Sequence, residues 1–394
     1  MLQLTYHQIK ACNEVFRRLN KLRRWTGILS KGTFNELNKQ AMNCMIVYIL
    51  GAFAEQAGMP VVWERFPKIA LYRAFQKIYV VFNTPEFKYD EIFELGNIQK
   101  AALFQTTKNK IREKTDEDFA DFLVEAVGTQ EETLFKAATK IATYIELLAL
   151  EPYCSPELYH KKLKDIFQEI QQYINVPGME VLSDTDSELF QLLEFISNSG
   201  LRHHVRWCEI GYLQECSILG HLFDTACFAY FMSLELEQKN EELATQRFFM
   251  GIWHDVAEAW TTDIPSPIKD CITGLRNATE VYEQKTLEEK IYSKVPEFLV
   301  SKLRDVMFED EQNIDKHKAL IKGADYLSAD SECWRQYVLG SRDIYFKEAI
   351  ERRLPDIESG KVTLTPECRK LFDYFRTYAA KLNLDELYYD ENDL

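Results

Sequence analysis

Apolar residues recur at three- and four-residue spacing along most of this chain, and this spacing restricts its fold more than any other feature. In one such stretch, Leu219, Leu222, Phe223 and Ala226 fall on the same side of a helix. This periodicity indicates amphipathic helices. Only 15 Gly and 11 Pro interrupt the 394 residues, and no set of alternating strands is evident. The sequence therefore predicts an all-α fold.

The charge of the chain limits its partners. Lys and Arg number 47 against 62 Asp and Glu, a formal net charge of −15. An acidic surface repels phosphate backbones, so we expect no non-specific binding to nucleic acid or to anionic membranes. A small phosphorylated ligand can still be held in a local basic pocket. We also expect a cytoplasmic protein, because the sequence has no leader-like apolar region, no apolar run long enough for a membrane span, and nine scattered cysteines without CxxC spacing.

The length favours two domains rather than one. Residues 176–188 combine Pro-Gly with serine and acidic residues, which is typical of a linker. We therefore predict one helical domain over residues 1–178 and a second over residues 188–394.

The two predicted domains show weak internal similarity. A shift of 182 positions places Arg24 and Trp25 on Arg206 and Trp207. The same or nearly the same shift aligns further blocks of the chain: 38–50 with 220–232, 136–144 with 318–326, and 70–88 with 251–269. One nearly constant offset across separate blocks favours an internal duplication.

Candidate metal ligands gather in the second half. His254 and Asp255 are adjacent near the end of an apolar helix that we expect to run to Thr261, with Glu258 one turn after His254. Neutral imidazole and carboxylate oxygen together suit divalent zinc, manganese, cobalt or magnesium. His221, on an otherwise apolar helix, and Asp325 are further candidate donors.

The pattern His221, His254-Asp255 and Asp325 resembles the signature of the HD-domain metal-dependent phosphohydrolases, an all-α superfamily. Within it, the branch of YfbR-type 5′-deoxynucleotidases is the most similar. That branch is similar in the Arg206-Trp207 pair, in the segment HDVAEAWTTDIPSPIK and in the segment KGAD that ends at Asp325. The resemblance covers roughly residues 195–350.

The resemblance implies a role for each residue that matches. His221, His254, Asp255 and Asp325 correspond to the ligands of one divalent ion (Mn, Co, Mg, Zn or Fe). In the superfamily, enzymes with two metals need further histidines between the HD pair and the last aspartate. This sequence has only His317 there, so a single ion is expected. The catalytic candidates are Glu258 and Asp263, which would handle the proton of a metal-bound water that attacks phosphorus. The substrate-binding candidates are Arg206, Trp207 and Lys269, with Lys322 as a further cation.

The predicted activity is release of phosphate from a nucleoside or deoxynucleoside monophosphate. Two alternatives stay open: a nucleotide-binding regulatory protein with little turnover, and a nucleoside triphosphohydrolase or another phosphoesterase at the same centre. Single residues also have structural interpretations. His221 alone could be a core histidine, Asp263 could serve a turn before Pro265, and Arg206 and Trp207 could be an ion-pair residue and a core aromatic.

The first half lacks every predicted ligand. Under the internal alignment, each site residue of the second half meets a different residue: Lys39 for His221, Arg73-Ala74 for His254-Asp255, Thr143 for Asp325, Lys77 for Glu258 and Phe82 for Asp263. Protonated Lys and Arg offer no lone pair, so we expect no metal there. We interpret this half as a degenerate HD-like scaffold, with a sensor pocket as the alternative. Such a copy can take the place of a second subunit, which predicts a monomeric pseudo-dimer, with a homodimer as the alternative.

Overall fold

The computed structural model describes residues 2–28, 30, 34–80, 96–207, 210–236, 240–261, 264, 266–307 and 314–381. Within these ranges the regular elements are helices, accompanied by two isolated β-bridges. The predicted all-α fold is confirmed. No helix in this part of the chain is long and apolar enough to cross a membrane.

The first half contributes a long series of helices, several of them with side-chain caps. Thr5 and Gln8 form a capping box at the start of α1, and Asn35 caps α2. The elements are α1 (Tyr6–Lys21), α2 (Glu36–Gln56), α3 (Arg65–Tyr79), α5 (Asn97–Lys114), α6 (Glu117–Val124), α7 (Gln130–Leu148), η1 (Glu151–Tyr153), α8 (Pro156–Gln171) and α9 (Met179–Ser183).

The second half follows a similar order of long and short helices. Its elements are α10 (Glu188–Glu194), η2 (Phe195–Leu201), α11 (Ile218–Leu236), α12 (Glu241–Trp253), α13 (Glu258–Thr261), α14 (Ser266–Cys271), α15 (Leu275–Lys290), η3 (Tyr292–Lys294), α16 (Glu297–Val306), α17 (Ile314–Leu339), α18 (Ile344–Glu358) and α19 (Pro366–Lys381).

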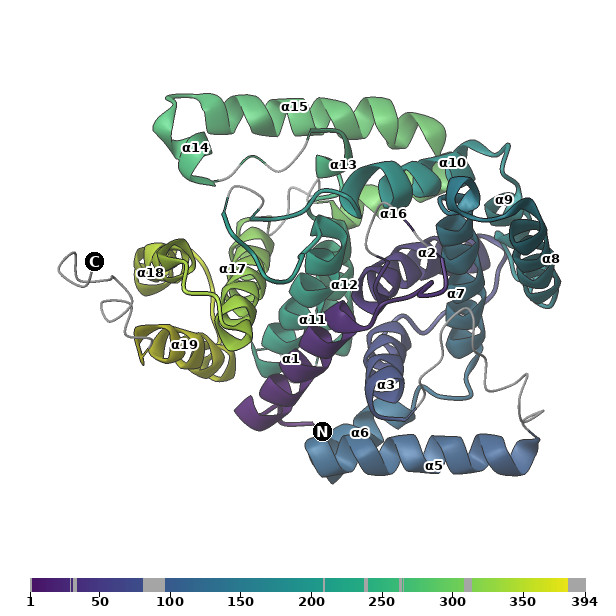
Figure 1. Ribbon diagram of the computed structural model, residues 1–394, viewed down its shortest axis with the longest axis horizontal. Coiled ribbons are helices and arrows are strands. Elements are labelled where there is room, and N and C mark those ends of the chain that lie inside the picture. The colour runs from purple at the N-terminus through teal and green to yellow at the C-terminus, as the bar shows by residue number, and fades with distance from the viewer. Residues whose placement is uncertain are drawn as a thin grey trace, which may run out of the picture.

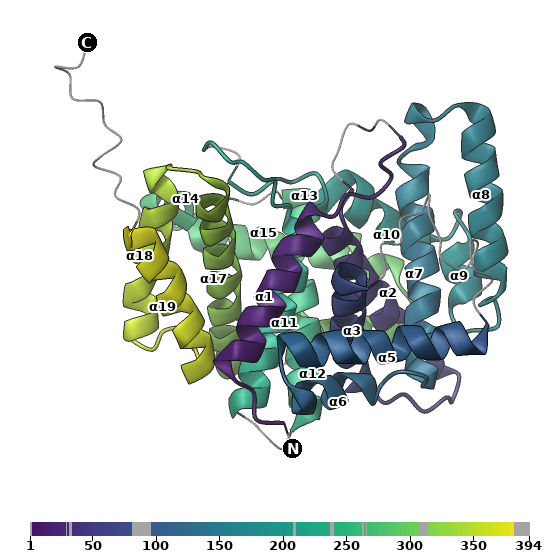
Figure 2. The same cartoon turned by 60° about the horizontal axis from the view of Figure 1, so that its bottom comes forward.

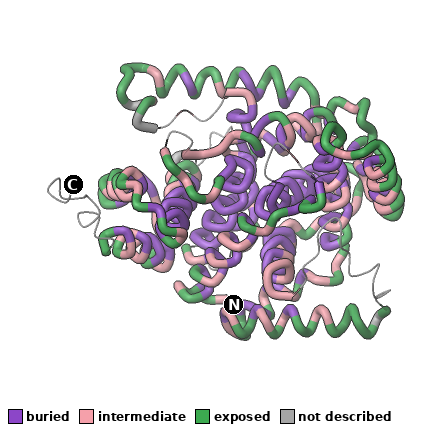
Figure 3. The backbone as a smooth tube through the Cα atoms, viewed as in Figure 1, coloured by how far each residue is buried: buried purple, intermediate pink, exposed green. Residues whose placement is uncertain are grey.

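Two helices, α2 and α11, lie side by side near the centre of the molecule (Figure 1). Both are buried along almost their whole length, whereas the long helices α5 and α15 are exposed along much of theirs (Figure 3). A helix that is apolar on all sides requires neighbours all round, which explains the central position. The α7–α8 pair and the α17–α18 pair lie at opposite ends of the molecule (Figure 2).

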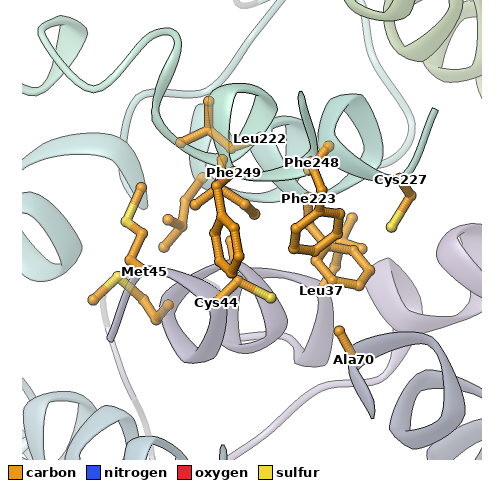
Figure 4. Close-up of a cluster of buried hydrophobic side chains, with 14 of the residues drawn as sticks. Leu37, Cys44, Met45, Ala70, Leu222, Phe223, Cys227, Phe248 and Phe249 are labelled. Carbon is orange, nitrogen blue, oxygen red and sulfur yellow. The ribbon is translucent and has the colours of Figure 1, made fainter. Parts of the chain in front are cut away.

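The two halves share one continuous hydrophobic core. Figure 4 shows Leu37, Cys44 and Met45 of α2 with Ala70 of α3, facing Leu222, Phe223 and Cys227 of α11 with Phe248 and Phe249 of α12. Aromatic pairs tie the halves together, with ring centroids 4.8 Å apart for Tyr48 and Phe249 and 5.7 Å apart for Phe16 and Phe223. Packing of this kind couples the stability of the two halves.

The predicted linker is folded rather than extended. Residues 176–188 include α9, and both Met179 and Leu182 are fully buried. Gly178 begins this short helix in a left-handed conformation, φ 88°, close to the ring of Phe53. The described cysteines are all free thiols, most of them buried, as predicted; Cys208 lies outside the described residues.

A matched turn precedes each central helix. The bridge between Arg23 and Asn35 precedes α2, and the bridge between Val205 and Ser217 precedes α11. In both turns the next backbone N–H, of Arg24 or of Arg206, donates over 2.7 Å to a carbonyl across the turn.

Each turn also holds a tryptophan in the left-handed region, with φ of 58° for Trp25 and 63° for Trp207. Such a conformation is strained for a bulky residue and requires support from the surrounding structure. The paired features of the two turns lie 182 positions apart, so they support the predicted duplication.

Candidate metal centre

Three packed helices, α11, α12 and α17, bring the predicted ligands together. His221 lies one turn into α11 and is 1% exposed. Single donor atoms of His221, His254 and Asp255 lie within 4.8 Å of one another. Asp325 of α17 joins this group through His221, because its Oδ1 lies 3.0 Å from His221 Nε2.

The helix that carries the HD pair is shorter than predicted. We expected a helix through to Thr261, but α12 ends at Trp253, residues 254–257 form turns, and α13 begins at Glu258. The His254 ring explains part of this break, because its Nδ1 lies 2.9 Å from the carbonyl of Gly251, three residues earlier. A side chain bonded to that carbonyl competes with the backbone for the last helical turn.

The His254 ring has a definite orientation. Since a carbonyl only accepts, Nδ1 carries the proton and Nε2 of the neutral ring is left with a lone pair. Nε2 is buried, has no hydrogen-bond partner among the described residues, and lies 3.0 Å from Asp255 Oδ2. Two lone-pair atoms at this distance repel each other unless a proton or a metal cation binds to them. The pair therefore fits a divalent metal.

The His221 ring has a similar arrangement. Its Nδ1 lies 3.2 Å from Glu332 Oε1 and 2.9 Å from the Ser328 hydroxyl. With the proton on Nδ1 toward the carboxylate, the Nε2 lone pair faces Asp325 Oδ1. Carboxylates behind metal-binding histidines commonly fix the ring in this way. Two imidazole nitrogens and two carboxylates thus form a donor set suited to one divalent ion.

The carboxylates of the site are kept charged. Without a metal, a proton on Nε2 of His254 removes the repulsion instead: burial raises the pKa of Asp255, but a positively charged His254 outweighs burial and holds the pKa at about 2. Burial likewise opposes ionisation of Asp325, whose pKa nevertheless falls well below its ordinary value because Lys322 and His221 are close. Lys322 Nζ lies 2.5 Å from Asp325 Oδ2, so this carboxylate faces His221 with one oxygen and Lys322 with the other.

Arg206 and Trp207 meet at the same buried carboxylate. Arg206 Nε donates to Glu332 Oε2 over 3.1 Å, and Trp207 Nε1 donates to the same oxygen over 2.8 Å. Burial raises the pKa of Glu332, but Arg206 and His221 outweigh it and lower the pKa below its ordinary range. Arg206 and Trp207 therefore hold the carboxylate that orients the His221 ring. Their contact with substrate stays a prediction.

The remaining candidate residues have neighbours other than the four predicted ligands. Glu258 is buried, and its backbone carbonyl lies 3.1 Å from Nδ1 of His204. Lys269 of α14 lies 3.7 Å from Glu283. His317 contacts the sulfur of Met250, 3.3 Å from its Nδ1. Asp263 lies outside the described residues.

Two acidic residues near the site were missed from the sequence. Burial raises the pKa of Glu283 on α15, and the neighbouring Asp255 carboxylate adds to this shift, although Lys269 opposes it. Glu332 has a counterpart in the first half, because Glu146 Oε2 accepts from Arg24 Nε and from Trp25 Nε1, each over 2.9 Å. The two glutamates are 186 positions apart, about one helical turn more than the shift of 182 used in the alignment. An alignment with one constant shift therefore does not pair Glu332 with Glu146.

Under the internal alignment, cations of the first half stand at the positions of the predicted metal donors of the second half. Lys39 occupies the position of His221 on α2 and donates to the hydroxyl of Thr143 on α7, just as His221 faces Asp325. Arg73 Nη2 pairs with Glu132 over 3.1 Å. Among the described residues, the cluster of His and Asp side chains that could hold a metal lies in the second half.

The sequence of the second half is similar to known nucleotidases. Residues 193–375 match the family described as 5′-deoxynucleotidase YfbR-like. A 5′-deoxynucleotidase of Pectobacterium atrosepticum is 26% identical over 205 residues, which cover 50% of this chain and 96% of that protein. A 5′-deoxynucleotidase of Yersinia pestis is 26% identical over 197 residues, or 48% and 92% of the two chains. The predicted resemblance is thereby confirmed for residues 193–375.

Proposed function

We propose that the second half of this chain is a metal-dependent phosphohydrolase that releases phosphate from a nucleoside or deoxynucleoside 5′-monophosphate. The observation that carries the proposal is the arrangement of two imidazole nitrogens opposite two carboxylates: His254 Nε2 lies 3.0 Å from Asp255, and His221 Nε2 lies 3.0 Å from Asp325. Similarity to the YfbR-like 5′-deoxynucleotidases supports the substrate class.

His221, His254, Asp255 and Asp325 would hold the ion. A divalent metal bound there lowers the pKa of water and offsets negative charge on phosphoryl oxygens. Glu258, buried close after the HD pair, is our candidate to accept the proton of the attacking water or to donate one to the leaving alkoxide. Asp263 is a second candidate for this role.

Cations on several elements would receive the phosphate. Lys322 lies beside Asp325, and Lys269 lies beside Glu283 at the end of α14. Arg206 Nε donates to Glu332, and a guanidinium suits phosphate oxygens because its N–H donors form a planar fork. The net charge of the protein is −15, so the positive potential that attracts the phosphate would be confined to the region around these cations.

The decisive experiment measures phosphate release from a panel of nucleoside and deoxynucleoside mono- and triphosphates with Mn²⁺ or Co²⁺. We expect Asp255→Ala to lose bound metal and hydrolysis together while circular dichroism stays unchanged. Glu258→Gln should retain metal and lose about 100-fold or more in kcat, because only proton transfer is affected. Full hydrolysis by Asp255→Ala would refute the proposal.

The panel also separates the alternatives. Phosphate release from triphosphates in preference to monophosphates would assign the chain to the triphosphohydrolases. Metal-dependent nucleotide binding without turnover, measured by calorimetry, would identify a regulatory protein instead.

A further inference from the structure

A buried cluster of charges lies in the first half, at the position that corresponds to the metal centre. Its centre is Lys39 of α2, which is 3% exposed. Glu36 and Glu146 flank Arg24, which pairs with both carboxylates at 2.8 Å and 2.9 Å. Lys39 donates to the Thr143 hydroxyl, which is a neutral group.

Two further cations reach the same carboxylates. Lys77 Nζ lies 3.8 Å from Glu36, and Arg202 Nη1 lies 3.5 Å from Glu146 Oε1. The described members of the cluster are thus four cations, Arg24, Lys39, Lys77 and Arg202, and two carboxylates, Glu36 and Glu146. Positive charge exceeds negative charge among them. Burial of unbalanced charge is costly, and a bound anion removes that cost.

One cation has hydrogen-bond donors to spare. Arg202 is 3% exposed, and its Nε and Nη1 have no hydrogen-bond partner among the described residues, although Nη2 donates to Ser197. Buried guanidinium donors are normally satisfied. Arg202 comes from the second half of the chain, directly after η2, and its guanidinium also lies 4.7 Å from the ring centre of Phe34.

The cluster is not completely buried, because side chains on α3 and α7 beside it are partly exposed. The side chains of Lys77 and Arg73 on α3 are 22% and 21% exposed, and Thr143 on α7 is half-buried. The cluster is therefore in contact with solvent at Lys77, although Lys39 itself is buried. Burial and the neighbouring Arg24 lower the pKa of Lys39 well below its ordinary value, a shift that an incoming anion would reverse.

We propose that this cluster is an anion-binding site for a phosphate group, either as inorganic phosphate or as the phosphate of a nucleotide. Lys39 supplies at this position the positive charge that a bound metal would supply in the second half. A dianionic phosphate balances the excess of two positive charges and accepts hydrogen bonds from Lys39, Lys77, Thr143 and Arg202. The site binds without hydrolysing, since its described residues include no cluster of metal donors.

The test uses the full chain with Asp255→Ala and EDTA, so that the second half neither holds metal nor turns substrate over. Isothermal titration calorimetry with orthophosphate should give one site per chain. Lys39→Met should weaken this binding at least 10-fold, and Lys77→Met should weaken it about 3-fold or more. Circular dichroism verifies that each variant is folded.

Controls assign the site to the first half. Lys285→Met, the loss of an exposed cation on α15 that pairs with Glu289, should leave phosphate binding unchanged in the same background. A parallel titration with adenosine 5′-monophosphate identifies the source of the phosphate group: tighter Lys39-dependent binding than orthophosphate indicates a nucleotide, and equal binding indicates phosphate alone. No binding by the folded Asp255→Ala protein, or binding unaffected by both Lys39→Met and Lys77→Met, would overturn the proposal.

Discussion

Oε1 of Glu332 lies 3.2 Å from Nδ1 of His221, on the edge of the ring away from Asp325. The other carboxylate oxygen of Glu332 accepts from Arg206 and Trp207. One buried carboxylate therefore fixes the ring of a proposed metal ligand and is itself held by the strained turn that contains Trp207.

Glu332→Gln should weaken metal binding by about 10- to 100-fold, because an amide N–H₂ toward His221 cannot accept the proton on Nδ1. The fold should persist, since the amide oxygen can still accept from Trp207. Titration of the metal-free protein with Mn²⁺ measures the effect. Glu146→Gln is the matched control, because Glu146 holds Arg24 and Trp25 in the same way but lies beside Lys39. Equal loss of Mn²⁺ affinity in both variants would contradict the role of Glu332.

Gly251→Ala should disturb both packing and the metal centre. A Cβ atom at this position would lie 2.5 Å from the backbone Cα of Ala226, so α12 would have to move away from α11. We expect a loss of about 1–3 kcal/mol in unfolding free energy. Metal affinity should also fall, because the carbonyl of Gly251 orients His254.

Urea unfolding and Mn²⁺ titration measure the two effects of Gly251→Ala. The control is Gly27→Ala, whose added Cβ meets no atom within 4 Å. The close approach of α11 and α12 would be unimportant if both alanine variants had the stability of the parent protein.

The effect of Glu36→Gln on the free energy of unfolding should depend on pH, and this dependence tests the charge cluster. Burial raises the pKa of Glu36, but Lys77, Arg24 and Lys39 outweigh it and hold the pKa at about 2, below the ordinary 4.5. A lowered pKa stabilises the fold above pH 4.5, and this stabilisation is lost as pH falls toward 2. The shift corresponds to about 3 kcal/mol at pH 7.

The measurement compares urea unfolding of the parent and of Glu36→Gln at pH 7 and at pH 3. We expect the difference between the two proteins to fall by about half or more at pH 3. Glu14→Gln removes an exposed carboxylate paired with Arg17 and should change stability by less than about 0.5 kcal/mol at either pH. A Glu36→Gln difference that stays the same at both pH values would contradict the lowered pKa.

Parts of this architecture could be predicted from local sequence. Apolar periodicity predicted the central helices, since α2 and α11 require burial on most of their surface. The adjacent His254 and Asp255 predicted a cluster that the structure brings together with His221.

Other features depend on contacts between distant segments. Glu332 is ordinary in sequence, and its importance arises only when α17 packs beside α11 and the turn at Trp207. The helix break at His254 depends on a ring bonded to the carbonyl of Gly251. The shared core could not be predicted either, because an apolar helix face indicates that the face is buried but not which helix packs against it.

A fragment of residues 188–394 should not remain a monodisperse monomer. The faces of α11 and α12 that contact α1 and α2 include Phe223 and Phe249, which pack against Phe16 and Tyr48. Removal of the first half exposes these apolar faces to water, and exposed patches of this kind cause association. Size-exclusion chromatography with light scattering should give one chain for the full protein, the expectation for a pseudo-dimer, and dimers or larger species for the fragment. A monomeric fragment with the thermal stability of the full chain would show instead that the two halves fold independently.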